Sequence, residues 1–339
     1  MTWDNAALEA RVVRYKDQIP CKNAFIDTKT PGSDQKENFC LIGPGVAERP
    51  DQHIHIAEPH GFNVGAARQP KGCVNSQHSH ETAEMFIVHE GEWKFTWGHD
   101  SSDGAAVLGP GDAISIPVNV FRGFEYVGEG KGYLFCVLGQ DDPGFVTWAP
   151  YVFEEAKNYG MILLEDSSLI DTTLGETIPE GKKEAKATRV EDLKNFRRMS
   201  RDEMLECVLL AKDMVPQSET ELTKHSKGLK EVAVIGVENS DEGIRAGKMN
   251  WSHDYQVRRW NLSAGGSIPA HKRFEPEVLF VHEGELTITG EFGQVTIMQG
   301  DTMTVPVDMI RSFENNGSQE SVIYVTRRDD KPKAPEWSK

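Results

Sequence analysis

The sequence predicts an all-β protein built from two related domains. Between residues 36 and 148, and again between 229 and 330, short apolar runs are separated by Gly, Pro and Asp. This pattern is typical of short strands joined by turns, and many such strands favour a sandwich or a barrel. The second region repeats motifs of the first. At 339 residues, the chain is long enough for two domains of ordinary size.

The remaining segments differ in character from these two regions. The linker is charged and interrupted by Pro and Gly, and it contains the only strongly helical patterns of the chain. We therefore expect five segments: an N-terminal arm at 1–35, a first β domain at 36–148, a helical and charged linker at 149–228, a second β domain at 229–330, and a tail at 331–339.

Two helices are expected in the linker. Pro150 can begin a helix, and Gly160 can end it, because proline suits the first turn and glycine the position after the last. Ser200 and Glu203 have the spacing of a capping box in front of an apolar run. They predict a second helix from about residue 201 to residue 214.

Composition limits the partners and the compartment. Lys and Arg total 37 against 53 Asp and Glu, a formal charge of −16, which argues against nucleic acid or an anionic membrane as a partner. No apolar run has transmembrane length, and the first residues lack a signal-peptide core. Five scattered cysteines without CxxC spacing are expected to be reduced thiols in a cytoplasmic protein. No motif indicates an interface, so a homo-oligomer stays open.

The stretch from residue 72 to residue 91 carries the strongest chemical signal. His78, His80 and Glu84 all have even numbers, so in an extended strand their side chains share one face. Phe86 continues that face as an apolar lining. Two imidazoles and one carboxylate form a ligand set for a divalent transition metal with open coordination positions.

The spacing of this stretch, Gly-x5-His-x-His-x3-Glu-x6-Gly, resembles the first signature motif of the cupin superfamily. The second cupin motif, Gly-x5-Pro-x-Gly-x2-His-x3-Asn, fits the frame of Gly111 and Pro117. Asn119, Arg122 and Tyr126 replace its glycine, histidine and asparagine. Arg122 cannot ligate a metal, because a guanidinium is always protonated and has no lone pair. The resemblance implies double-stranded β-helix, or jelly-roll, barrels.

A second copy of both motifs follows in the chain. Residues 265–284 repeat the first motif 193 positions later, with His271 and Glu277 in the places of His78 and Glu84. The chain therefore resembles a duplicated cupin, or bicupin.

The second copy lacks most of the ligand set. Arg273 replaces the second histidine, and Arg311 replaces the last one. Two fixed positive charges would repel a dication, and Glu277 has guanidinium partners at hand. We expect a metal-free pocket or a packing site there.

Two further patterns have two interpretations each. Trp93, Phe95 and Trp97 alternate with polar residues, so they form the aromatic face of one strand. That face either lines a substrate cavity or fills the barrel core. His53 and His55 also alternate; they form either a second metal pair or, as is more usual for an isolated pair, a solvated or hydrogen-bonded face.

The ligand set and the resemblance together point to a metal-dependent enzyme. Cupins of similar arrangement include dioxygenases, and two histidines with one carboxylate resemble the facial triad of non-haem iron oxygenases. We expect one divalent ion per chain at His78, His80 and Glu84, with Fe(II) favoured and Zn, Mn or Ni as alternatives. The favoured reaction is dioxygenation of an acidic, aromatic small molecule. The alternatives are a non-redox isomerase or lyase of a sugar or keto acid, and a bicupin that binds a small molecule without turnover.

Two residues are expected to act beside the metal. Arg122 should lie near the cavity with one of two partners, the carboxylate of Glu84 or a carboxylate of the substrate. We favour the substrate, because a planar guanidinium can hold a carboxylate through two hydrogen bonds. Arg122 and Glu84 are thus the candidate catalytic residues, and Trp93, Phe95, Trp97 and Phe86 are the candidate pocket wall.

Overall fold

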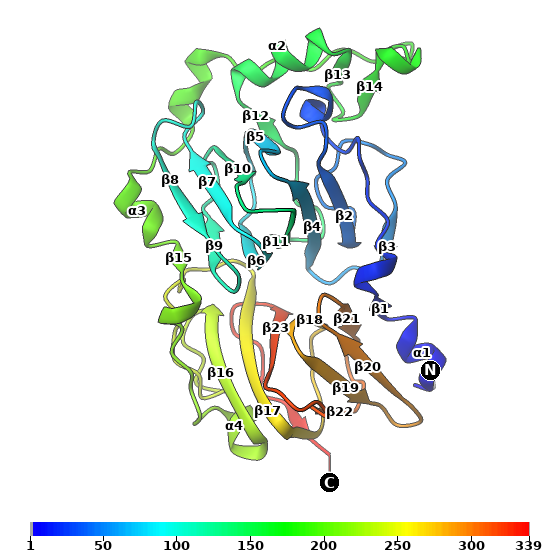
Figure 1. Ribbon diagram of the computed structural model, residues 1–339, viewed down its shortest axis with the longest axis vertical. Helices are drawn as coiled ribbons and strands as arrows, with labels where there is room; N and C mark the ends of the chain where they lie inside the picture. Colours follow the sequence, from blue (N-terminus) through cyan, green and yellow to red (C-terminus); the bar gives the residue numbers. More distant parts are fainter. Residues whose placement is uncertain (1–2, 339) are drawn as a thin grey trace. The chain divides into compact units, whose positions relative to one another are not determined.

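The computed structural model describes residues 3–338 of the chain. It consists of two compact units, which we call the first barrel (Ile19–Leu210) and the second barrel (Met1–Gln18 with Ala211–Lys339) (Figure 1). Both are built mainly of strands, so the expected all-β fold with two barrels and a partly helical linker is confirmed. The arm expected at 1–35 and the linker expected at 149–228 are each divided between the two units.

The first barrel consists of two main sheets, one of seven strands and one of five. The larger sheet has the order β15 (Val208–Leu209), β9 (Ala113–Ile116), β6 (Glu84–Glu90), β11 (Lys131–Gly139), β4 (Phe62–Pro70), β2 (Glu37–Ile42) and β3 (Ile54–Ile56). The smaller sheet has the order β12 (Thr147–Trp148), β5 (Val74–Ser79), β10 (Arg122–Tyr126), β7 (Trp93–Trp97) and β8 (Gly104–Leu108). A separate hairpin pairs β13 (Met161–Leu163) with β14 (Leu169–Asp171).

The second barrel is one ten-stranded sheet. Its main path is β1 (Val12–Val13), β21 (Thr302–Val305), β18 (Glu277–Glu283), β23 (Ser321–Arg328), β17 (Tyr255–Lys272), β22 (Arg311–Glu314), β19 (Glu285–Thr289) and β20 (Gln294–Met298); β16 (Lys227–Ile235) and β24 (Glu336–Trp337) also pair with β17.

Strand β17 joins the two faces of the second barrel. Its first part pairs with β23 and its last part with β22. This single strand of 18 residues therefore corresponds to the two strands β4 and β5 of the first barrel. There, the chain turns between the two strands at Gly72, whose φ is 79°, a left-handed conformation that glycine adopts without a steric penalty.

The helices are short, and one differs from the expectation. α2 (Pro150–Asn158) begins and ends as predicted, with Gly160 in a left-handed conformation. In Figure 1 it lies beyond the ends of β5 and β12. α3 (Arg201–Leu205) has the predicted capping box of Ser200 and Glu203 but is only five residues long. The prediction of a helix to residue 214 was wrong, because Val208 and Leu209 pair with β9 as a strand. Within residues 3–338, the two other α-helices are α1 (Asn5–Glu9) and α4 (Glu221–His225).

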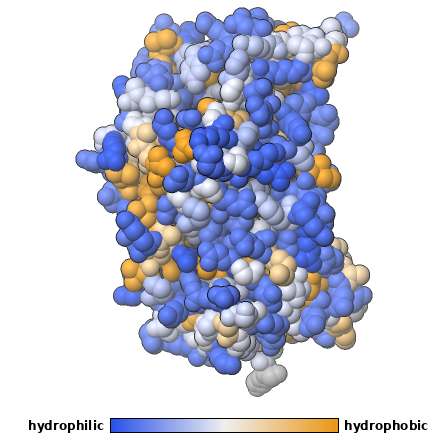
Figure 2. Space-filling model, viewed as in Figure 1, coloured by the Kyte–Doolittle hydropathy of each residue, from blue (hydrophilic) through white to orange (hydrophobic). Residues whose placement is uncertain are grey.

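The surface matches the composition. The face in Figure 2 is mainly hydrophilic, with hydrophobic side chains scattered over it. Among the residues that the structure describes, no helix is long and apolar enough to cross a membrane.

A buried ion pair fixes the start of the first barrel against β5. The side chains of Asp27 and Lys36 are both 0% exposed and form an ion pair. Asp27 Oδ2 also accepts a hydrogen bond from the backbone N of Ser76 (3.0 Å), and Lys36 Nζ donates to Asn75 Oδ1 (3.0 Å). The pair thus holds the two residues of β5 that come just before Gln77 and His78.

Replacing Lys36 should therefore destabilise the first barrel. Lys36→Met would leave the Asp27 carboxylate buried without its partner, and breaking a buried pair costs about 3–5 kcal/mol. The free energy of unfolding in urea measures the loss. Lys22, whose side chain is 73% exposed, provides the control, since Lys22→Met should change stability by no more than about 0.5 kcal/mol. Equal stability of the two variants would contradict this prediction.

Candidate metal centre

The three candidate ligands come together at the ends of two strands. His78 lies on β5, His80 follows its last residue, and Glu84 begins β6. The expectation that all three share one face of a single strand was wrong, because the chain turns between the two strands and it is this turn that brings Glu84 to the histidines. All three are buried, and one ligand atom from each lies within 4.8 Å of the other two. His80 Nε2 is 3.8 Å from Glu84 Oε1. In the described part of the chain, this is the only group of three or more His, Cys, Asp or Glu with such geometry.

Backbone contacts fix the tautomer of His78. Its Nδ1 lies 2.7 Å from the carbonyl oxygen of Ser76, which can only accept a hydrogen bond. Nδ1 therefore carries the proton, and the lone pair of Nε2 is available as a ligand. A second hydrogen bond of this kind also fixes the orientation of a ligating imidazole ring.

Burial keeps both imidazoles neutral. It lowers the pKa of His78 and His80 well below the usual value, and the positive charge of Arg122 lowers both further. Burial raises the pKa of Glu84, an effect that Arg122 partly offsets. Neutral imidazoles and a buried carboxylate that gains from a nearby cation are the states in which these side chains bind metal. The donor set therefore fits a divalent transition ion.

Arg122 contacts Glu84. It begins β10, where it is paired with His78 of β5. Its Nε donates to Glu84 Oε2 (3.2 Å), its Nη2 donates to the same oxygen, and its Nη1 donates to the carbonyl of His78 (3.2 Å). Of the two partners expected for Arg122, the structure has Glu84, where we favoured the substrate. The contact occupies Oε2 and leaves Oε1 beside His80.

A cavity of about 80 Å³ opens beside the three ligands. His78, His80, Glu84 and Phe86 line one part of it. Most of the rest comes from β2, β4, β11 and the loop after β2, largely through small or apolar residues such as Val46, Gly65 and Leu138. The remaining described lining residues are Phe25, Asn75 of β5 and Phe124 of β10. Among the described lining residues there is no Lys or Arg. The sequence reasoning missed this second wall, although its residues lie on strands that it expected.

The aromatic strand packs in the core. Trp93, Phe95 and Trp97 are at most 1% exposed and are not among the described lining residues of the cavity. Phe95 lies behind the wall, with its ring centroid 5.4 Å from that of Phe86 and 5.9 Å from that of Phe124. Of the two interpretations, this geometry favours core packing, because β2 and β4 contribute to the described lining of the cavity and β7 does not. Phe86 does line the cavity, as expected.

Phe95→Ala should therefore act mainly on stability. Removing a buried aromatic side chain costs about 3–5 kcal/mol, and the metal content of the folded fraction should stay as in the wild type. Urea unfolding beside elemental analysis measures both. The matched control is Val107→Ala on the adjacent strand β8, where the side chain is 57% exposed. A stable Phe95→Ala protein with impaired ligand binding would instead support the pocket interpretation.

His53 and His55 do not form a metal pair of the expected kind. His55 Nε2 accepts from the backbone N of Ile19 (3.1 Å), and its Nδ1 lies 3.0 Å from the carbonyl of Cys40. Both ring nitrogens are used in hydrogen bonds, which leaves no lone pair for a metal. His55 therefore fits the second interpretation, that of a hydrogen-bonded histidine.

The second copy forms an ion-pair site. Arg311 Nη2 donates to Glu277 Oε2 (2.8 Å), as Arg122 does to Glu84, and Arg327 Nη2 lies 3.5 Å from Glu277 Oε1. Burial raises the pKa of Glu277, but the nearby arginines outweigh it and lower the pKa to about 2. The sequence predicted Arg273 and Arg311 as partners. Arg311 does pair with Glu277, whereas Arg273 pairs with Glu242 and Glu275, and the sequence did not indicate Arg327.

Comparisons with known proteins agree with this architecture. Residues 67–138 match the family model described as "Cupin domain". Over 99% of this chain and 80% of the other, the fold is similar to that of a deletion mutant of Bacillus subtilis oxalate decarboxylase (TM-score 0.58, 14% identity). The chain has the bicupin fold. The formate complex of Lactobacillus farciminis oxalate decarboxylase is also similar, over 95% of this bicupin and 87% of that chain (TM-score 0.57, 10% identity). We found no match among curated protein sequences.

Proposed function

We propose that this bicupin is a metal-dependent enzyme with one divalent ion in its first barrel, held by His78, His80 and Glu84. The proposal rests on one observation: the ligand atoms of these three buried residues lie within 4.8 Å of one another beside a cavity. A bound ion would supply Lewis-acid polarisation of a substrate oxygen, and iron would also supply oxygen chemistry.

The other residues of the site position the ligands. The carbonyl of Ser76 holds the Nδ1 proton of His78, so the lone pair of Nε2 would be the one to bind the ion. Arg122 binds Glu84 Oε2 and leaves Oε1 for the ion. Trp148 packs on His78, with ring centroids 5.3 Å apart, and donates from Nε1 to Glu48 Oε1. These contacts limit the movement of the first histidine.

The cavity favours a small substrate. Its volume of about 80 Å³ is well below the roughly 300–1,000 Å³ of pockets for drug-sized ligands. Because no Lys or Arg lines it among the described residues, a substrate carboxylate would depend on the metal for its charge partner. A small acid of few non-hydrogen atoms fits this description better than the aromatic acid expected from the sequence.

Two reaction classes remain candidates. The two histidines and one carboxylate support a non-haem Fe(II) dioxygenase. A lyase acting on a small acid is supported by the similarity of the fold to proteins described as oxalate decarboxylases, and the small volume of the cavity suits such a substrate.

The metal assignment predicts one ion per chain. His80→Ala should reduce the metal content of purified protein from one ion to nearly none, because it removes one of three ligands. His271→Ala is the matched control in the second barrel and should leave the content at one. Elemental analysis per chain measures both variants. Two ions per native chain, or full metal content in His80→Ala, would rule out the assignment.

Comparison of turnover in oxygen with turnover under argon tests the reaction class. Protein loaded with Fe(II), Mn(II) or Zn(II) without oxygen is offered oxalate, other small acids and aromatic acids. A dioxygenase consumes oxygen in step with product, whereas a lyase turns over under argon and a decarboxylase releases CO₂. Turnover should be lost in His80→Ala in either case. Saturable binding without turnover in both atmospheres would instead support the binding-protein alternative.

A further inference from the structure

The interior of the second barrel differs from that of the first in three arginines. Strand register identifies the equivalent positions. Arg327 pairs with Glu277 as Leu138 pairs with Glu84, so Arg327 stands in the place of Leu138.

The other two arginines are placed in the same way. Arg258 pairs with Val325 on β23, at the place where Gly65 pairs with Cys136 on β11. Arg273 occupies the motif position of His80. Leu138, Gly65 and His80 all line the cavity of the first barrel, so the arginines occupy the corresponding wall of the second.

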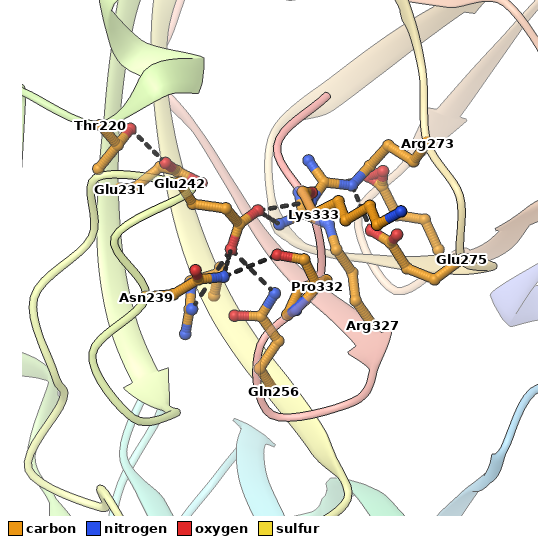
Figure 3. A network of polar contacts seen from close by, with 12 residues as sticks. Thr220, Glu231, Asn239, Glu242, Gln256, Arg273, Glu275, Arg327, Pro332 and Lys333 are labelled. Carbon is orange, nitrogen blue, oxygen red and sulfur yellow. Dashed lines mark hydrogen bonds and ion pairs between the residues drawn. The ribbon is translucent and has the colours of Figure 1, made fainter. Parts of the chain in front are cut away.

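These arginines surround a carboxylate of the chain itself. Glu242 lies in the loop between β16 and β17, and in Figure 3 its carboxylate points between Arg273, Arg327, Asn239 and Gln256. Arg273 Nη2 donates to Oε1, and Arg327 Nη1 lies 3.5 Å from the same oxygen.

The other carboxylate oxygen of Glu242, Oε2, also has several partners. Oε2 accepts from Asn239 Nδ2 (3.3 Å) and from Gln256 Nε2 (3.2 Å), and Arg258 Nη2 is 3.7 Å away. Three guanidinium groups and two amides therefore face the carboxylate of Glu242. Two of these arginines have a further carboxylate partner each, Glu275 for Arg273 and Glu277 for Arg327.

The carboxylate of Glu242 is ionised although it is buried. Burial raises its pKa, but the charges of Arg273, Arg327 and Arg258 outweigh burial and leave the pKa lowered. Arg258, Arg273 and Arg327 are at most 1% exposed. The arginines keep spare donors, since Arg258 Nε, Arg273 Nη1 and Arg327 Nε have no hydrogen-bond partner among the described residues.

We propose that the second barrel is a carboxylate-binding site whose ligand is the chain's own Glu242. Glu242 lies in the loop after β16. In the first barrel, the corresponding loop follows β2, and it contributes Gly43, Val46 and Ala47 to the lining of the cavity. The ligand class is a small aliphatic monocarboxylate, because the bound group is one carboxylate on a short methylene chain. This inference does not depend on the metal or the reaction of the first barrel.

Removal of the internal ligand should expose the site to a free carboxylate. Glu242→Ala deletes one methylene and the carboxylate, and acetate replaces those atoms. In the full-length variant, acetate should raise the melting temperature in a saturable way. A concentration 100 times the dissociation constant corresponds to a shift of about 100-fold in the folding equilibrium constant. Sodium chloride at equal ionic strength and the neutral amide acetamide should have no saturable effect.

Three proteins serve as controls. The wild type and Glu242→Gln keep the site filled and should not respond to acetate in a saturable way. Glu283→Ala removes a glutamate whose side chain is 62% exposed, and it should not respond either. An equal response of Glu242→Ala and Glu283→Ala would overturn the proposal, as would a response to chloride that matches the response to acetate.

The stability of Glu242→Ala in the absence of acetate is a second, independent test. Without acetate, Glu242→Ala should be less stable than Glu283→Ala, because its arginines lose their shared partner. Equal stability of the two would overturn the proposal. If Glu242→Ala does not fold in plain buffer, refolding that succeeds with acetate and fails with chloride supports the site, and refolding that fails with both contradicts it.

Discussion

The pairing of a buried arginine with a buried glutamate underlies both barrels. Arg122 contacts Glu84 in the first, and Arg311 contacts Glu277 in the second. All four side chains are buried, and a charge buried without its partner is strongly destabilising. Each pair also connects two strands, β10 with β6 and β22 with β18. The position that carries a histidine in the cupin motif therefore serves here to hold a carboxylate.

The two barrels differ in the side chains that lie near the other carboxylate oxygen, Oε1, of that glutamate. In the first barrel, Glu84 Oε1 faces His80, and the neighbouring position on β11 is Leu138, which carries no charge. Oε1 is therefore the carboxylate oxygen that Arg122 leaves for the proposed ion. In the second barrel, Arg327 occupies that position and pairs with Glu277 Oε1. One framework thus yields a candidate metal centre in one copy and an ion-pair network in the other.

The loops that follow β2 and β16 extend this difference. The first leaves a small, mostly apolar cavity beside the candidate ligands, and the second inserts Glu242 among three arginines. The second interior is thus occupied by paired arginine and glutamate side chains, and the candidate metal ligands lie in the first barrel.

The sequence by itself determined the parts of this protein that depend on local periodicity. The motif spacing selected His78, His80 and Glu84, although they meet at the ends of β5 and β6 and not along one strand. The two repeated motifs showed that the second copy lacks two of the histidines of the cupin pattern. The all-β class and the helix after Pro150 followed from the same local rules.

Only the tertiary structure decided which element covers each face. The partner of Arg122, the core position of Phe95 and the meeting of Arg258, Arg327 and Glu242 all depend on contacts between strands or loops far apart in the chain. The end of α3 has the same origin, since strand pairing with β9 replaced the helix that local propensity favoured. Periodicity fixes the direction of a side chain relative to its own strand, whereas its partner is set by the register of the other strands.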